Sequence, residues 1–171
     1  MKLFFGFIIG VILLPLCGWL YFRFGYAPVA TASSPIPFER ELAHMALEAR
    51  IRAEAPKKSP IEASDENFFA GAHVYRTQCA VCHGVPGQPD YPTAKGMFPK
   101  PPQLFKGHGV TDDRVGETYW KVANGIRLTG TPAYTGSLKD KEMWQVSLML
   151  AKADKLPQKA RSTLEQPLDV R

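Results

Sequence analysis

The hydrophobic and polar positions divide the chain into a long apolar run, a short amphipathic stretch and a segment with three helical patterns. Residues 3–22 contain no charged side chain and lie between Lys2 and Arg23. A helix of about 20 residues spans the hydrocarbon core of a bilayer. Residues 1–26 are therefore predicted to be a single-pass membrane anchor, and a signal peptide cleaved near residues 30–32 is the alternative.

Aromatic side chains at the end of the apolar run favour the retained anchor. They are Trp19, Tyr21, Phe22, Phe24 and Tyr26. Such rings gather where a membrane meets water, because the ring prefers the apolar layer and its polar atom prefers water. A signal peptide also has a shorter apolar region, of roughly 7–15 residues.

Residues 27–64 are predicted to be a tether that contains one amphipathic helix. Prolines keep residues 28–37 extended. Between residues 38 and 53, apolar side chains recur at helical spacing among charged ones, namely Leu42, Met45, Ala46 and Ile51. Two further prolines within residues 55–60 end this helix.

Residues 65–156 are predicted to be the compact domain, and residues 157–171 a loose polar tail. Three helices are predicted in this domain. The first begins at Ser64 or Asp65 and runs toward Cys79. The second spans residues 113–124 with Thr111 or Asp112 as its cap, and the third spans residues 140–153. Residues 84–105 are rich in proline and cannot hold a long helix. We expect this loop to wrap around a rigid object.

The strongest chemical signal is the sequence Cys79-Ala80-Val81-Cys82-His83. A Cys-x-x-Cys-His motif is the attachment signature of a c-type haem. On a helix, positions three and four residues apart share one face, so both thiols can bond one porphyrin edge while the imidazole binds the iron. A zinc site would need a second ligand pair, and a redox dithiol would need a strand–helix–strand context. One covalent haem c with His83 as the proximal iron ligand is the prediction.

Composition narrows the possible functions. The chain has 171 residues, a formal charge of +5 and three cysteines. No block of basic residues with interleaved aromatics marks a nucleic-acid site, and no organic substrate is indicated. Two cysteines belong to the haem motif and the third, Cys17, lies in the apolar run, so no disulfide framework is expected.

Three short helices, an early haem motif and a late helix with a tryptophan resemble a class I, monohaem c-type cytochrome of the membrane-anchored bacterial type. The resemblance covers residues 65–156 and implies an all-α fold around one covalent haem. In that family the first and last helices cross at a small residue flanked by aromatic rings. Gly71, Tyr75 and Trp144 suit those places.

The resemblance also implies how the proximal histidine is held. In the family, a proline in the loop after the motif places its carbonyl to accept the histidine N–H. Pro102 is the candidate here, with Pro101 as the alternative. The bond fixes the tautomer of His83 and makes it a more basic ligand. The predicted haem-binding residues are therefore Cys79, Cys82, His83 and Pro102.

One residue departs from the family pattern. The family carries Gly-Met-Pro in the loop on the distal side of the haem, and its methionine is the sixth iron ligand. This chain has Gly130-Thr131-Pro132, and threonine has no thioether. The first expectation is a site that is vacant or holds water, and the second is a replacement ligand, Met97 or His108.

The function implied is one-electron transfer in a periplasmic respiratory or dehydrogenase chain, by a carrier that is not an enzyme. Its expected place is the inner membrane, with the haem domain in the periplasm, because bacteria attach haem c outside the cytoplasmic membrane. Expected partners are the membrane, through the N-terminal helix, and a redox protein donor and acceptor. The alternative is a five-coordinate haem module that binds NO, CO or peroxide, as a sensor or weak peroxidase with Arg127 as a possible acid–base group.

Overall fold

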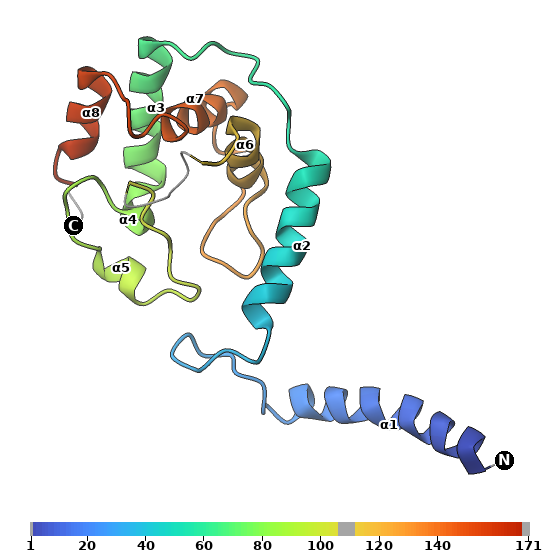
Figure 1. Cartoon of the computed structure of the whole chain (residues 1–171). Coiled ribbons are helices and arrows are strands. Elements are labelled where there is room, and N and C mark those ends of the chain that lie inside the picture. The colour runs from blue at the N-terminus through green and yellow to red at the C-terminus, as the bar shows by residue number, and fades with distance from the viewer. Residues whose placement is uncertain (1, 106–111, 169–171) are drawn as a thin grey trace. The chain divides into compact units, whose positions relative to one another are not determined.

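The computed structural model describes residues 2–105 and 112–168, and these residues form helices and loops without a β-strand (Figure 1). The chain divides into two compact units, residues 1–43 and 44–171. Its helices are α1 (Lys2–Arg23), α2 (Glu39–Glu54), α3 (Asp65–Gln78), α4 (Ala80–His83), α5 (Pro92–Lys95), α6 (Val115–Asn124), α7 (Asp140–Leu150) and α8 (Gln158–Glu165). The predicted all-α fold is confirmed.

The first unit is dominated by α1. Within it, Phe4–Arg23 has a mean hydropathy of 2.2, and none of this stretch is buried inside the protein. Apolar surface exposed to water costs roughly 25 cal/mol per Å². The helix is long and apolar enough to cross a membrane, a property that membrane anchors and signal sequences share.

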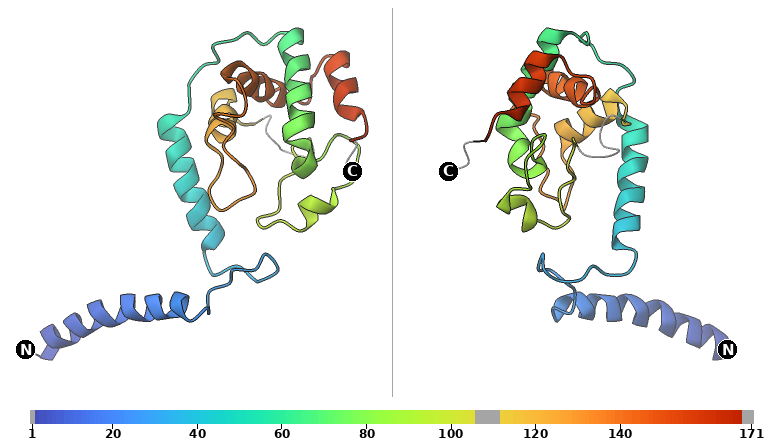
Figure 2. Two further views of the ribbon diagram at one scale, coloured as in Figure 1. Left: turned by 180° about the vertical axis from the view of Figure 1, so that it is seen from behind. Right: turned by 60° about the vertical axis from the view of Figure 1, so that its left-hand side comes forward.

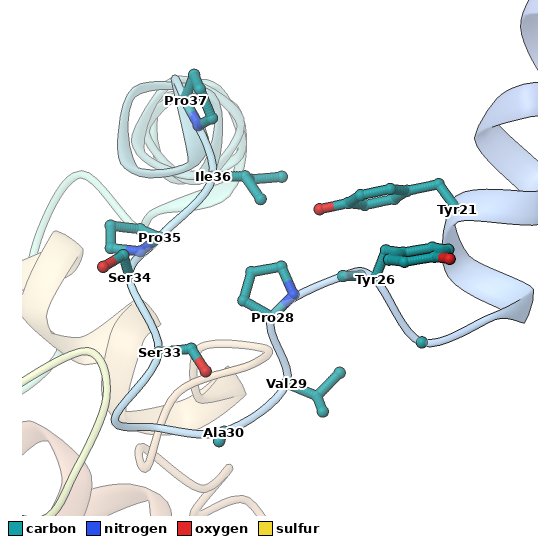
Figure 3. Close-up of a pocket in the computed structure, with 12 residues that line it drawn as sticks. Tyr21, Tyr26, Pro28, Val29, Ala30, Ser33, Ser34, Pro35, Ile36 and Pro37 are labelled. Carbon is teal, nitrogen blue, oxygen red and sulfur yellow. The ribbon is translucent and has the colours of Figure 1, made fainter.

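The segment after α1 folds back onto the end of that helix. The rings of Tyr21 and Tyr26 stack with centroids 6.4 Å apart and 22° between their planes. Figure 3 shows these rings with Pro28 and Ile36 around a hollow lined by residues between 21 and 37. Its lining contains no cysteine, histidine or methionine. It therefore offers no nitrogen or sulfur ligand for a haem iron.

The core of the second unit forms where α3 packs against α7 and α8 (Figures 1 and 2). At Gly71 the backbones of α3 and α7 meet: a β-carbon there would lie 2.7 Å from the carbonyl carbon of Gln145 and 2.9 Å from Met149 Cβ. Only glycine permits this approach, as the family resemblance implies for the small residue at the crossing. Buried apolar side chains around it include Phe68, Ala72, Tyr75, Val146, Leu148, Met149 and Leu150.

Helix α6 packs on α7 through a pair of aromatic rings. Trp144, which is 4 % exposed, stacks on Tyr119 with centroids 3.9 Å apart and 11° between the planes. Trp144 comes directly before Gln145, the residue at which α7 contacts α3, while the Trp144 ring joins α7 to α6. The aromatic residue expected at the helix crossing therefore also joins α7 to α6.

Part of the predicted tether packs on the compact domain. Ile51 is buried, and the Trp120 indole N–H donates to Glu54 Oε2 at 3.0 Å. A β-carbon on Gly116 would collide with the carbonyl group of Pro56. The second unit accordingly begins at residue 44, whereas the sequence predicted a boundary at residue 65. The charged residues around Ile51 hid this contact, because a single buried position gives a weak pattern.

The predicted loose tail at residues 157–171 is wrong for the part that the structure describes. Helix α8 buries Ala160, Thr163 and Leu164, three positions that share one helix face. The Arg76 guanidinium also donates to the backbone oxygens of Gln166 and Pro167. A short helix between two prolines, polar on its outer face, has too few apolar residues to stand out in the sequence.

The helix limits differ from the predictions by a few residues. Ser64 caps α3 as predicted, its Oγ accepting from the Asn67 N–H at 3.3 Å. Helix α6 begins after Arg114, whose N–H donates to Glu117 Oε2 at 3.3 Å, rather than after Asp112. The alternative cap, Thr111, lies outside the described residues. Helix α7 ends at Leu150, because the next residues form turns.

Candidate haem-binding site

A break in the helix between α3 and α4 presents the haem motif. Cys79 ends α3, with its N–H donating to the Tyr75 carbonyl at 2.8 Å, and also begins α4. The His83 N–H donates to the Cys79 carbonyl at 2.9 Å, which closes one helical turn. The motif therefore has the i, i+3, i+4 geometry that its spacing predicts.

The two thiols are free and half-buried. Burial, with the neighbouring Cys82 thiol, raises the pKa of Cys79 to about 12. Within residues 2–105 and 112–168, no three His, Cys, Asp or Glu side chains converge as a metal site. This donor set fits thioether bonds to a porphyrin better than a zinc ion.

The imidazole of His83 is oriented from the following loop. Its Nδ1 lies 2.8 Å from the carbonyl oxygen of Pro102, so Nδ1 carries the proton and Nε2 has the free lone pair. Burial lowers the pKa of His83, and the bond to Pro102 opposes that shift. The neutral imidazole is the form that binds iron. These residues fit a haem that is attached at Cys79 and Cys82 and ligated by His83.

Tyr75 holds the backbone directly after the histidine. Its hydroxyl donates to the Gly84 carbonyl at 2.7 Å, and its ring meets the Phe105 ring edge-on with centroids 5.0 Å apart. The side chain is completely buried, and burial raises the pKa of its hydroxyl. Sequence reasoning placed Tyr75 at the helix crossing and missed this bond. The tyrosine lies nine residues before Gly84, and only the helix break brings the two together.

Tyr134 performs a similar task for the loop between α6 and α7. Its hydroxyl donates to the carbonyl of Gln78, the last residue of α3, at 2.9 Å. Burial raises the pKa of Tyr134 to about 12, and the nearby Cys79 and Cys82 thiols add to the shift. The loop is thereby fastened next to the haem motif. Sequence reasoning missed this role, and an aromatic residue among the small residues at 129–137 was the available signal.

Thr131 lies in that loop and its backbone is fully engaged. Its N–H donates to Thr129 Oγ1, and its carbonyl accepts from the Ile126 N–H, both at 3.1 Å. The preceding residue, Gly130, contacts the end of the Met97 side chain. Arg127, the possible acid–base residue, is exposed. The other predicted replacement ligand, His108, lies outside the described residues.

Comparison with known proteins identifies this arrangement. The sequence model of the family described as cytochrome c matches residues 69–152, a stretch that contains the whole motif and the loop around Thr131. Residues 69–152 are a cytochrome c domain. Cytochromes c bind haem c covalently and carry electrons on its iron, and the two motif cysteines of this domain fit that attachment. The predicted all-α cytochrome c domain and the haem c cofactor are confirmed.

A solved structure has a similar fold. It is a chain of the Kuenenia stuttgartiensis reducing HAO-like protein complex, with a TM-score of 0.50 and 23 % sequence identity. The match covers 58 % of this chain and 49 % of that chain, so this chain spans about half the length of its neighbour. At this identity the likeness shows the fold alone. No curated protein matches the sequence.

Proposed function

We propose that this cytochrome is a membrane-anchored, one-electron carrier of the bacterial periplasm, with a single haem c held by Cys79, Cys82 and His83. The observation that carries the proposal is the 2.8 Å contact between His83 Nδ1 and the Pro102 carbonyl oxygen. A histidine held in this way presents a neutral Nε2 of raised basicity to a metal. An oriented axial imidazole next to two free thiols is what covalent haem attachment requires.

The cofactor, when bound, supplies an iron that exchanges one electron between its ferric and ferrous states. The residues of the chain position it and limit its contact with water. Tyr75 and Pro102 hold the segment around His83, and Tyr134 holds the loop on the other side of the motif. These contacts hold the segments around the haem motif in place, a role that suits an electron carrier.

Helix α1 supports the proposed location. It is long and apolar enough to cross a membrane and carries aromatic residues at its C-terminal end. A domain tethered to the inner membrane on its periplasmic side meets membrane-bound redox partners at high effective concentration. A protein donor and a protein acceptor, docking transiently, are the partners we propose.

The attachment is tested by producing the full chain with a cytochrome c maturation system. We expect haem that stays bound on a denaturing gel in the wild type and in Cys17→Ala, the matched control outside the motif. The variant Cys79→Ala/Cys82→Ala should retain none. A potentiometric titration of the wild type should follow a single one-electron curve. A wild-type chain without covalent haem would refute the proposal.

The location is tested separately by alkaline extraction of membranes and mass analysis of the N-terminus. An anchor predicts that the chain stays in the pellet with residues 1–26 intact. A soluble product that starts near residue 33 would replace the anchor by a signal peptide and leave the electron-carrier proposal standing.

A ligand-binding haem module remains the second candidate because of one residue. Thr131 stands where the cytochrome c family carries its methionine ligand, and an open iron would bind CO, NO or peroxide. Binding of CO to the ferrous wild-type protein would favour this function. A low-spin spectrum that CO does not change would favour the carrier.

A further inference from the structure

The side chain of Met97 extends to the loop that carries Thr131. A β-carbon on Gly130 would collide with the Met97 methyl carbon and would lie 3.5 Å from Met97 Sδ. The methyl group thus occupies the space that any side chain at position 130 would need. Gly130 directly precedes the threonine that stands in the place of the family's methionine ligand. The thioether therefore lies beside the position from which a sulfur is missing.

This contact joins two loops that extend from the same end of the helical core. One loop, residues 96–105 after α5, carries both Met97 and Pro102, and the other connects α6 to α7 and carries Thr131 (Figures 1 and 2). The first loop orients His83 through Pro102, and the second is fastened beside the cysteines through Tyr134. Met97 belongs to the first loop and touches the second.

Other sulfur and imidazole side chains among the described residues are badly placed for the iron. Met143 and Met149 are 4 % and 0 % exposed inside α7, so either would have to leave the core. His44 and Met45 lie on α2 and are exposed, Met45 by 63 %. His73 is exposed on α3, edge-on to the Phe69 ring. Among the described methionine and histidine residues other than His83, Met97 is therefore the one that lies in a loop of the haem domain.

We propose that Met97 Sδ is the sixth, axial ligand of the haem iron and replaces the methionine that Thr131 lacks. The inference rests on the proposed function, because it assumes that the motif carries haem c. Methionine is unbranched and has three rotatable bonds, so its sulfur can turn while its methyl group stays beside Gly130. A thioether ligand favours ferrous iron, raises the reduction potential and closes the iron to small ligands.

The test uses the full haem-loaded chain in detergent, with covalent haem measured first. The readouts are the near-infrared charge-transfer band of ferric methionine ligation, the hyperfine-shifted methyl resonance of a ligating methionine, and CO binding to the ferrous protein. We expect the wild type and Met45→Ala, the matched control, to show both sulfur signals and to resist CO. Met97→Ala should lose both signals, become high-spin and bind CO at least about tenfold more tightly.

Two further variants keep the result independent of folding. Met97→Ala/Thr131→Met should regain the sulfur signals, because the family's own ligand position is restored. Gly130→Ala should weaken them, since its methyl group displaces Met97 Cε. Sulfur signals that persist in Met97→Ala would overturn the inference, as would their absence from haem-loaded wild type, whether His108 or water binds instead. A chain without covalent haem would instead overturn the proposed function.

Discussion

The loop that follows His83 and the loop around Thr131 are held by contacts of different reach. On the proximal side, the bonds from Tyr75 to Gly84 and from His83 to Pro102 join residues 9 and 19 positions apart. The loop around Thr131 depends on Tyr134, whose partner Gln78 lies 56 positions away. The orientation of His83, the proposed proximal ligand, is thus specified almost locally, whereas the position of the Thr131 loop depends on the folded domain. A sequence motif therefore predicts the first proposed ligand more securely than the second.

The largest expected effect is a difference in haem content between variants of the two loops. His83→Ala removes the proposed proximal ligand and should abolish the low-spin haem spectrum and reduce covalent haem severalfold. Thr131→Ala removes a side chain with no ligand sulfur and should leave haem per chain unchanged. Haem per chain, measured as the pyridine haemochrome, checks both. Equal losses of haem in the two variants would mean that the two loops contribute equally to haem binding.

The second-largest effect is expected at the contact between α3 and α7 in the helical core that carries both loops. Gly71→Ala forces a methyl group against the backbone of Gln145, and overpacking of this kind costs about 1–3 kcal/mol or more. We expect a value near the upper end, because backbone cannot move aside. Denaturant unfolding of the haem-loaded protein measures it. The control is Gly96→Ala, whose nearest neighbour would be 3.9 Å from the new carbon.

The two tyrosines offer a matched comparison of smaller size. Tyr75→Phe leaves the buried Gly84 carbonyl without its partner, which should cost about 1–3 kcal/mol. Tyr134→Phe removes a bond at a half-buried position and should cost about 0.5–1.5 kcal/mol. The free energies of unfolding of the two variants, each compared with that of the wild type, measure these two costs. A larger loss at Tyr134 would show that the long-range fastening matters more than the local one.

The smallest effect is expected at the start of α6. The hydrogen bond from the Arg114 side chain lowers the pKa of Glu117, so the carboxylate stabilises the fold at pH values above its unfolded pKa of about 4.3. That contribution disappears as the pH falls through the lower folded pKa. Glu117→Gln should cost less than about 1 kcal/mol at pH 7, because Arg114 is largely exposed. The difference from the wild type should shrink at pH 3, and a constant difference would contradict the assignment.

The sequence predictions are accurate where an element depends on residues close in sequence, and they fail where it depends on distant residues. The cap at Ser64 and the three helices of the haem domain depend on neighbouring residues, and the structure has them within a few positions. Helix α8 was missed because its three buried residues gain their stability from α3. The contact of Pro56 with Gly116 was missed for the same reason, since nothing near residue 56 indicates its partner.

The sequence by itself determined the apolar helix α1 and the haem motif. In both cases the chemistry depends on spacing along one helix, and 3.6 residues per turn makes that spacing predictable. Only the tertiary structure decided that Tyr134 lies beside the motif cysteines and that Met97 touches Gly130. These pairs meet because packing of the helices positions the loops, and packing depends on side chains along the whole domain.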